Sequence, residues 1–162
     1  MNLRLLTTPL LATGLLLSTL GCSKKEEDAK PTNGTASYKL DGVTRTCQVT
    51  ATITNITNNS TPNDLLHLTL TTIPEPAGGK EVVNLYLSKA VGQPTSAYQP
   101  YSFDYSGKSV TSGAYLSGIL YNNITTSISQ TSGGGFSGTF KATTNPTVYG
   151  PISDGVYTDV RP

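Results

Sequence analysis

The chain has no tryptophan, a single histidine and two cysteines among its 162 residues, and charged residues make up only 13% of it. A usual zinc site takes three or four ligands from histidine, cysteine and carboxylate side chains, so this composition argues against one. The 11 basic residues nearly balance the 10 acidic residues, which gives no electrostatic preference for nucleic acid or for an acidic ligand. We therefore expect no metal ion, no cofactor and no nucleic-acid partner.

Residues 1–21 have the pattern of a cleaved export signal. Arg4 precedes an apolar stretch over residues 10–20, and a charged run begins shortly after it. A helix that spans a bilayer needs about 20 predominantly apolar residues. This stretch is shorter, so we expect it to be removed as a signal peptide and not retained in a membrane.

The end of this segment resembles a lipobox, in which a small residue precedes a cysteine that is acylated before cleavage. The matching residues are Thr19-Leu20-Gly21-Cys22. We therefore predict cleavage after residue 21 and lipidation of Cys22 with fatty acid such as palmitate, followed by a flexible charged tether over residues 22–33. The lipid would attach the protein to a membrane of the cell envelope, as an outer-membrane lipoprotein. The alternative is an ordinary secretory signal with an incidental cysteine.

A charged run directly behind the predicted anchor bears on orientation. It consists of Lys24, Lys25, Glu26, Glu27 and Asp28. The run resembles the export signal that follows the acylated cysteine in Bacteroidota-type lipoproteins and sends them to the cell surface. A generic hydrophilic tether would have a similar composition and would serve equally well in the periplasm, so the periplasmic orientation stays open beside surface display.

Residues 34–162 have the pattern of one all-β domain. Threonine, serine, valine, isoleucine and tyrosine are abundant, which favours strands. Over residues 43–53 apolar and polar side chains alternate, as do those around Leu66, Leu68 and Leu70, and this period of two is typical of a strand with one buried face. Several such runs separated by turn residues predict a single antiparallel β-sandwich, with an open β-barrel as the alternative.

Turn residues predict how these strands connect. Asp41-Gly42 and Asp154-Gly155 are pairs that tight hairpins favour, and a further turn is predicted at Ser106-Gly107-Lys108. The expected hairpins join residues 37–40 with 43–53, 124–130 with 136–143, and 148–152 with 156–160.

Three stretches of the domain resemble a family of uncharacterised lipoproteins of the Bacteroidota type. They are Ser37-Tyr38-Lys39-Leu40-Asp41-Gly42, Phe136-Ser137-Gly138-Thr139-Phe140, and the closing residues 152–160. These motifs are a turn and packed strands. The resemblance therefore implies a β-sandwich in the cell envelope, and it transfers no active-site residue.

Few side chains in the domain suggest chemistry. His67 lies on the polar face of its predicted strand, so we expect it to face solvent, and a catalytic site built on it would need partners from distant loops. Cys47 alternates with Val49 and Ala51, which predicts a buried and inert thiol in place of a redox or cross-linking cysteine.

The acidic residues are scattered along the domain, without the spacing of an acid and base that act on a glycosidic bond. We therefore predict a protein without enzymatic activity. A hydrolase that gathers carboxylates from separate strands and a structural subunit of an outer-membrane complex are the alternatives, and a calcium ion held by loop oxygens also stays open.

Tyrosine is the enriched aromatic residue, and Tyr98, Tyr101 and Tyr105 lie close to Pro100, which marks an edge strand or loop. Exposed tyrosine rings can stack on sugars or bury area in a protein interface. The alternative is that the three rings cover the edge of the core. We take them as the candidate binding patch of a lipid-anchored envelope protein whose loops bind a glycan or protein partner.

Overall fold

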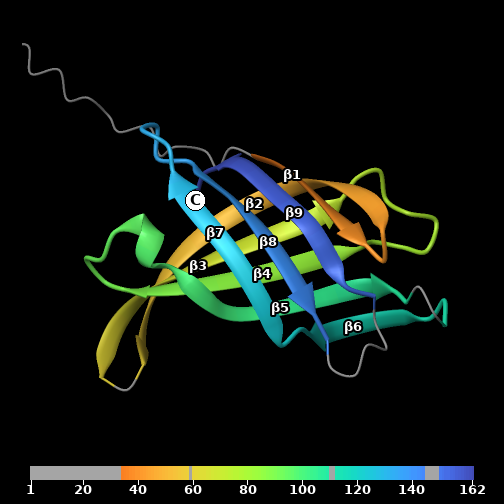
Figure 1. Cartoon of the computed structure of the whole chain (residues 1–162), viewed down its shortest axis with the longest axis horizontal. Helices are drawn as coiled ribbons and strands as arrows, with labels where there is room; N and C mark the ends of the chain where they lie inside the picture. Colours follow the sequence, from red (N-terminus) through yellow and green to blue (C-terminus); the bar gives the residue numbers. More distant parts are fainter. Residues whose placement is uncertain (1–33, 59, 110–111, 145–149) are drawn as a thin grey trace, which may run out of the picture.

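A computed structural model of the chain describes residues 34–58, 60–109, 112–144 and 150–162 (Figure 1). The predicted signal segment and tether lie outside the described residues. Among the residues that are described, no helix is long and apolar enough to cross a membrane. The elements are β1 (Gly34–Leu40), β2 (Val43–Asn58), β3 (Thr61–Thr72), β4 (Val82–Ala90), the short 3-10 helix η1 (Thr95–Ala97), β5 (Gln99–Lys108), β6 (Tyr115–Leu120), β7 (Asn123–Gln130), β8 (Phe136–Thr143) and β9 (Ile152–Val160).

The strands form one nine-stranded sheet in the order β6-β5-β4-β3-β2-β1-β9-β8-β7, and every neighbouring pair is antiparallel. The sheet curls on itself into a half-barrel, so that β7, β8 and β9 lie across β3, β4 and β5 (Figure 1). The prediction of an all-β antiparallel fold is confirmed. Because strand pairing continues through the whole order, the arrangement corresponds to the open-barrel alternative and not to two separate sheets.

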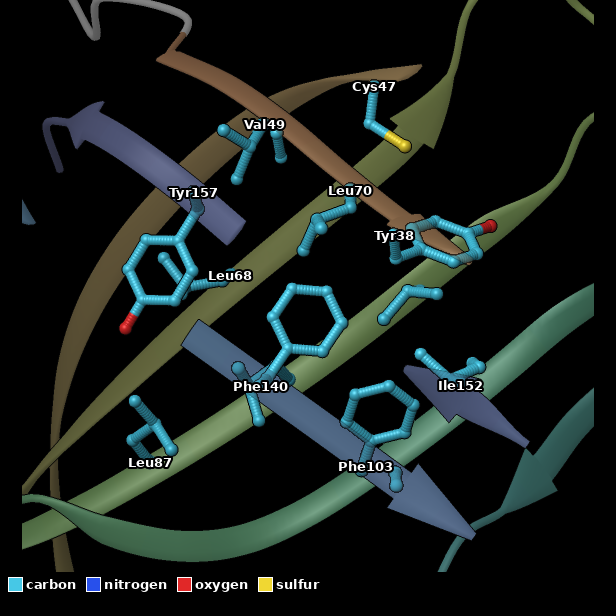
Figure 2. Close-up of a cluster of buried hydrophobic side chains, with 14 of the residues drawn as sticks. Tyr38, Cys47, Val49, Leu68, Leu70, Leu87, Phe103, Phe140, Ile152 and Tyr157 are labelled. Atoms are coloured by element: carbon cyan, nitrogen blue, oxygen red, sulfur yellow. The ribbon is translucent and has the colours of Figure 1, made fainter. Parts of the chain in front are cut away.

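The core fills the inside of this curl. Alternate residues of each strand point inward, and the leucines of β3 and β4 that do so are fully buried, among them Leu68, Leu70 and Leu87. Figure 2 shows Phe140 of β8 in the middle of the cluster, with Phe103 of β5 beside it. Their ring centroids are 5.8 Å apart. One continuous apolar face therefore packs against itself across the half-barrel.

Two of the three predicted hairpins are confirmed. Residues 37–40 pair with the start of β2 through a turn in which Leu40 faces Val43. Asp41 and Gly42 have φ angles of 50° and 77°, the positive values that a two-residue hairpin turn requires. β7 pairs with β8 over the predicted residues 124–130 and 136–143.

The third predicted hairpin, 148–152 with 156–160, is wrong. Asp154 and Gly155 lie inside β9, while residues 145–149 are outside the described residues. Asp154 has a φ of 50°, and the pairing register shifts beside it on both neighbouring strands. A residue with positive φ occurs in tight turns and in β-bulges alike, and here Asp154 supplies it for a bulge.

The turn predicted at Ser106-Gly107-Lys108 is wrong as well, because these residues belong to β5. A Cβ atom at Gly107 would lie 2.3 Å from the hydroxyl oxygen of Tyr105. Glycine at this position therefore makes room for the Tyr105 ring within a strand, and it does not reverse the chain.

Candidate functional site

The two ends of the sheet meet at one corner of the half-barrel. β6 and β7 are the outermost strands on opposite sides of the order, yet only Tyr121 and Asn122 lie between them in sequence. The backbone N–H of Tyr121 donates to the carbonyl of Phe103 in β5 over 3.0 Å, and the N–H of Asn122 donates to the carbonyl of Thr143 in β8 over 3.1 Å. These two bonds hold both ends of the sheet together at the corner.

Beyond this corner a slot lies between β5 and β7. The slot has a volume of about 530 Å³, which is within the range of small-molecule sites. In β5, pairing with β6 begins only at Asp104, so the earlier residues of β5 border the slot. The lining residues are Gln99, Pro100, Tyr101, Ser102, Leu120, Tyr121, Asn122 and Ile124.

The floor of the slot belongs to the core. Tyr121 is buried, its ring lies edge-on to Phe103 with centroids 5.3 Å apart, and its hydroxyl donates to the carbonyl of Gly150 over 3.1 Å. Burial raises the pKa of Tyr121 to about 12. Ile124 packs against the core beside it. The floor is therefore a fixed surface, with both ends of the Tyr121 side chain held in place.

The rim of the slot, in contrast, is exposed and partly apolar. Tyr101 has 58% of its surface exposed and Leu120 has 64%. In the pairing of β4 with β5, Leu87 faces Pro100 and Tyr86 faces Ser102, so Tyr101 is the extra residue of a bulge. A bulge changes the direction of the side chain it carries, which accounts for an exposed ring at a position where β5 otherwise buries its residues.

A polar network lies on the outer face next to the slot. The Asn84 amide nitrogen donates to Asp104 Oδ1 over 2.9 Å, which directs the Asn84 Oδ1 toward β3. This oxygen accepts a hydrogen bond from the Thr69 hydroxyl at 3.2 Å and lies 3.0 Å from His67 Nε2. Because an amide oxygen only accepts, His67 Nε2 carries a hydrogen and donates.

This arrangement decides what His67 can do. Its Nε2 is 3.1 Å from the Thr69 hydroxyl. Because Nε2 already carries a hydrogen, it cannot accept a hydrogen bond from that hydroxyl. The ring stacks on Tyr86 with centroids 4.2 Å apart and an interplanar angle of 11°. His67 lies on the outer face as expected, and it is half-buried by these neighbours. It serves as a hydrogen-bond donor in a surface network.

The three tyrosines of the predicted binding patch do not form one surface. Tyr98 is buried and its ring lies edge-on to Phe136 with centroids 6.3 Å apart. Tyr105 is also buried, and its hydroxyl donates to the carbonyl of Lys108 over 3.2 Å. A shared patch is therefore wrong, because two of the rings complete the core. Tyr101 alone of the three is exposed, at the rim of the slot.

Cys47 is buried, with 1% of its surface exposed, as the alternation predicted. Its sulfur lies 3.8 Å from the Thr72 hydroxyl. Burial raises the pKa of the thiol to about 11, so the nucleophilic thiolate is disfavoured near neutral pH. The other predicted site residues, Cys22, Lys24, Lys25, Glu26, Glu27 and Asp28, lie outside the described residues.

Most acidic side chains of the domain have partners of their own. Glu81 pairs with Arg45, Asp64 with Lys89, Asp154 with Lys39 and Asp159 with Arg161. In the part of the chain that the structure describes, no group of three or more histidine, cysteine, aspartate and glutamate residues could hold a metal ion. These carboxylates serve as partners for basic side chains.

The sequence reasoning did not find Leu120, Asn122 or Ile124 as site residues. Asn122-Asn123 is a pair of turn-forming residues, and a turn of this kind usually joins neighbouring strands. Here it joins the two ends of the sheet, and nothing local distinguishes the two cases. The chain matches no protein-family model, no curated protein and no solved structure, so the candidate site rests on geometry.

Proposed function

We propose that the protein is a lipid-anchored, non-enzymatic envelope protein that binds a ligand or partner in the slot between β5 and β7. The observation that supports this site is the pair of exposed side chains at its rim, Tyr101 and Leu120, above a fixed floor. Tyrosine is enriched among the residues that contribute most to binding, and aromatic and hydrophobic side chains line most ligand pockets.

The membrane attachment in this proposal rests on Cys22 at the end of the predicted signal segment. The run Lys24 to Asp28 supports display at the cell surface. Residues 22–33 would connect the lipid to Gly34, the first residue of β1, and leave the domain free to meet a partner. Two or three acyl chains hold a protein at a membrane stably, whereas one chain gives only marginal binding.

Binding is favoured over catalysis because the polar side chains of the domain are engaged with one another. A general base needs a free acceptor within reach of the proton that it takes. His67 Nε2 donates to Asn84, so Nδ1 is the one acceptor left on this ring. Asp104 accepts from the Asn84 amide, and Glu81 is held by Arg45. No contact among the described residues specifically favours the hydrolase alternative.

The proposal is tested by placing a photo-crosslinking amino acid at position 101 of the full chain in intact cells. Illumination should yield adducts at position 101. The matched control is position 115 in β6, because Tyr115 is also an exposed tyrosine, at 54%, and it does not line the slot. Equal adducts at both positions, or none at position 101, would overturn the proposed site.

A further inference from the structure

The geometry points to an uncharged sugar as the ligand, with one ring stacked on Tyr101 at the rim of the slot. This inference rests on the proposed function, since it names the chemical class that the same site would bind. Besides Pro100, the lining combines two tyrosine rings, two aliphatic side chains, two amides and a serine hydroxyl, which are groups that suit a sugar ring.

The described residues that line the slot carry no charged side chain. None of the eight lining residues is lysine, arginine, histidine, aspartate or glutamate. An acidic residue, Asp104, is paired with the lining residue Leu120 across β5 and β6. Its Oδ1 accepts a hydrogen bond from the Asn84 amide. A charged ligand that leaves water needs an opposite charge as compensation. The described lining offers none, so neutral ligands are favoured over phosphates, carboxylates and amines.

The polar side chains of the slot suit hydroxyl groups. Gln99 and Asn122 each provide an amide with two donor hydrogens and an accepting oxygen, and Ser102 provides a hydroxyl that can donate and accept. A sugar hydroxyl also donates and accepts, so any of these side chains can satisfy it. Groups of this kind bind neutral polar ligands without requiring a counter-charge.

The apolar side chains of the rim suit the face of a sugar ring. A pyranose ring presents C–H groups on its flat faces, and an aromatic ring buries them while the tyrosine hydroxyl stays in water. Tyr101 and Leu120 are the exposed apolar residues of the slot. Tyr121 below them is fixed by Phe103 and by the Gly150 carbonyl, and a fixed surface lowers the cost of ordering on binding.

An extended peptide, the other common ligand of an open sheet, fits less well. Strand addition needs a row of regularly spaced backbone groups, but Pro100 has no N–H and Tyr101 lies in a bulge, which are two features that block edge pairing. Recognition through side chains is therefore favoured over recognition through the backbone.

The test uses the full lipidated chain, extracted in a detergent without a sugar head group. Its affinity is measured for a panel of immobilised neutral oligosaccharides and for the same glycans carrying sulfate or uronic acid groups. We expect binding to at least one neutral glycan and binding weaker by about tenfold to its charged counterpart, because the slot cannot compensate the charge.

Matched variants locate the binding. Tyr101→Ala should weaken it by about tenfold through loss of stacking, whereas Tyr101→Phe should keep it within about threefold. Tyr115→Ala is the control and should leave the affinity unchanged. Near-ultraviolet circular dichroism confirms that each variant is folded.

Three outcomes would overturn the inference. Sugar binding that persists in Tyr101→Ala places the sugar elsewhere. Absence of sugar binding together with a protein adduct at position 101 in cells shows that the ligand class is wrong while the proposed function stands. Absence of sugar binding and of any adduct at position 101 removes both the ligand class and the proposed site.

Discussion

The guanidinium of Arg45 forms a two-point ion pair with the carboxylate of Glu81, in which Nε lies 2.6 Å from Oε2 and Nη2 lies 3.4 Å from Oε1. Arg45 belongs to β2 and Glu81 directly precedes β4, so the pair bridges the end of β3, which lies between these strands in the sheet. Only 3% of the Glu81 side chain is exposed. The hydrogen bond to Glu81 raises the pKa of Arg45.

We predict that Arg45→Met lowers the free energy of unfolding by about 3 kcal/mol, because it leaves the buried Glu81 carboxylate without its partner. The double variant Arg45→Met with Glu81→Leu should recover most of this loss, since no buried charge remains. Urea unfolding measures both. Lys39→Met is the control, because it removes the solvent-exposed pair with Asp154 and should have no measurable effect. A double variant as unstable as the single one would contradict the explanation.

The different positions of the three tyrosines predict different effects on stability. Tyr98→Ala and Tyr105→Ala should each cost about 3 kcal/mol, because they empty volume in the core. Tyr101→Ala should stay within about 0.5 kcal/mol of the wild type, as expected of an exposed side chain. Thermal and urea unfolding of the three variants give the comparison. A large loss in Tyr101→Ala would show that this ring supports the bulge in β5.

Cys47 should make stability depend on pH in the alkaline range. Burial raises the pKa of its thiol from 9.0 to about 11, and the hydrogen bond with Thr72 opposes this shift. The folded protein therefore keeps a proton that the unfolded chain has already lost between pH 9 and 11. The contribution of Cys47 is fully present below about pH 9, and it is lost as the pH rises toward 11, by about 1.4 kcal/mol per pH unit.

Tyrosines titrate in the same range, so the comparison is made with Cys47→Ala. The difference in free energy of unfolding between the two proteins should shrink from pH 9 to pH 11. The same burial predicts slow alkylation of Cys47 in the native state and fast alkylation in urea. A constant difference, or rapid native alkylation, would show that the thiol is reached by solvent.

Lipid attachment is predicted to depend on Cys22. Replacing it with alanine should abolish incorporation of labelled fatty acid and leave an unprocessed precursor, because the acyl group is added before cleavage. Cys47→Ala is the control and should incorporate label normally. Labelled fatty acid that remains on Cys22→Ala would show that the anchor is elsewhere.

Surface display is predicted to require the acidic residues behind the anchor. Changing Glu26, Glu27 and Asp28 together to alanine should protect the protein from protease added to intact cells while lipid labelling persists. A receptor needs these carboxylates, whereas a simple spacer depends only on length and flexibility. Substituting Ser23 alone with alanine controls for a change near the anchor. A wild-type protein already protected in intact cells, but digested after lysis, would contradict surface display.

Features set by neighbouring residues were predicted well from the sequence. The alternation over residues 43–53 identified a strand and placed Cys47 on its buried face. Asp41-Gly42 identified the first hairpin, because positive φ is a local property of these residues. The same pair of residue types misled at Asp154-Gly155, where Asp154 alone has a positive φ and the pair forms a bulge inside β9 instead of a turn.

The sequence by itself determined that segments such as those of β2, β3 and β8 are strands and which side of each is apolar, because the period of two is a property of adjacent residues. Tertiary structure decided which strand edges meet. β1 pairs with β9 from the far end of the domain, and the link at Tyr121 and Asn122 joins the two ends of the sheet. It also decided that Tyr98 and Tyr105 are buried while Tyr101 borders a slot. These outcomes depend on how the whole sheet curls around Phe103 and Phe140. That curvature results from packing between side chains that are far apart in the sequence, so no local pattern predicts it.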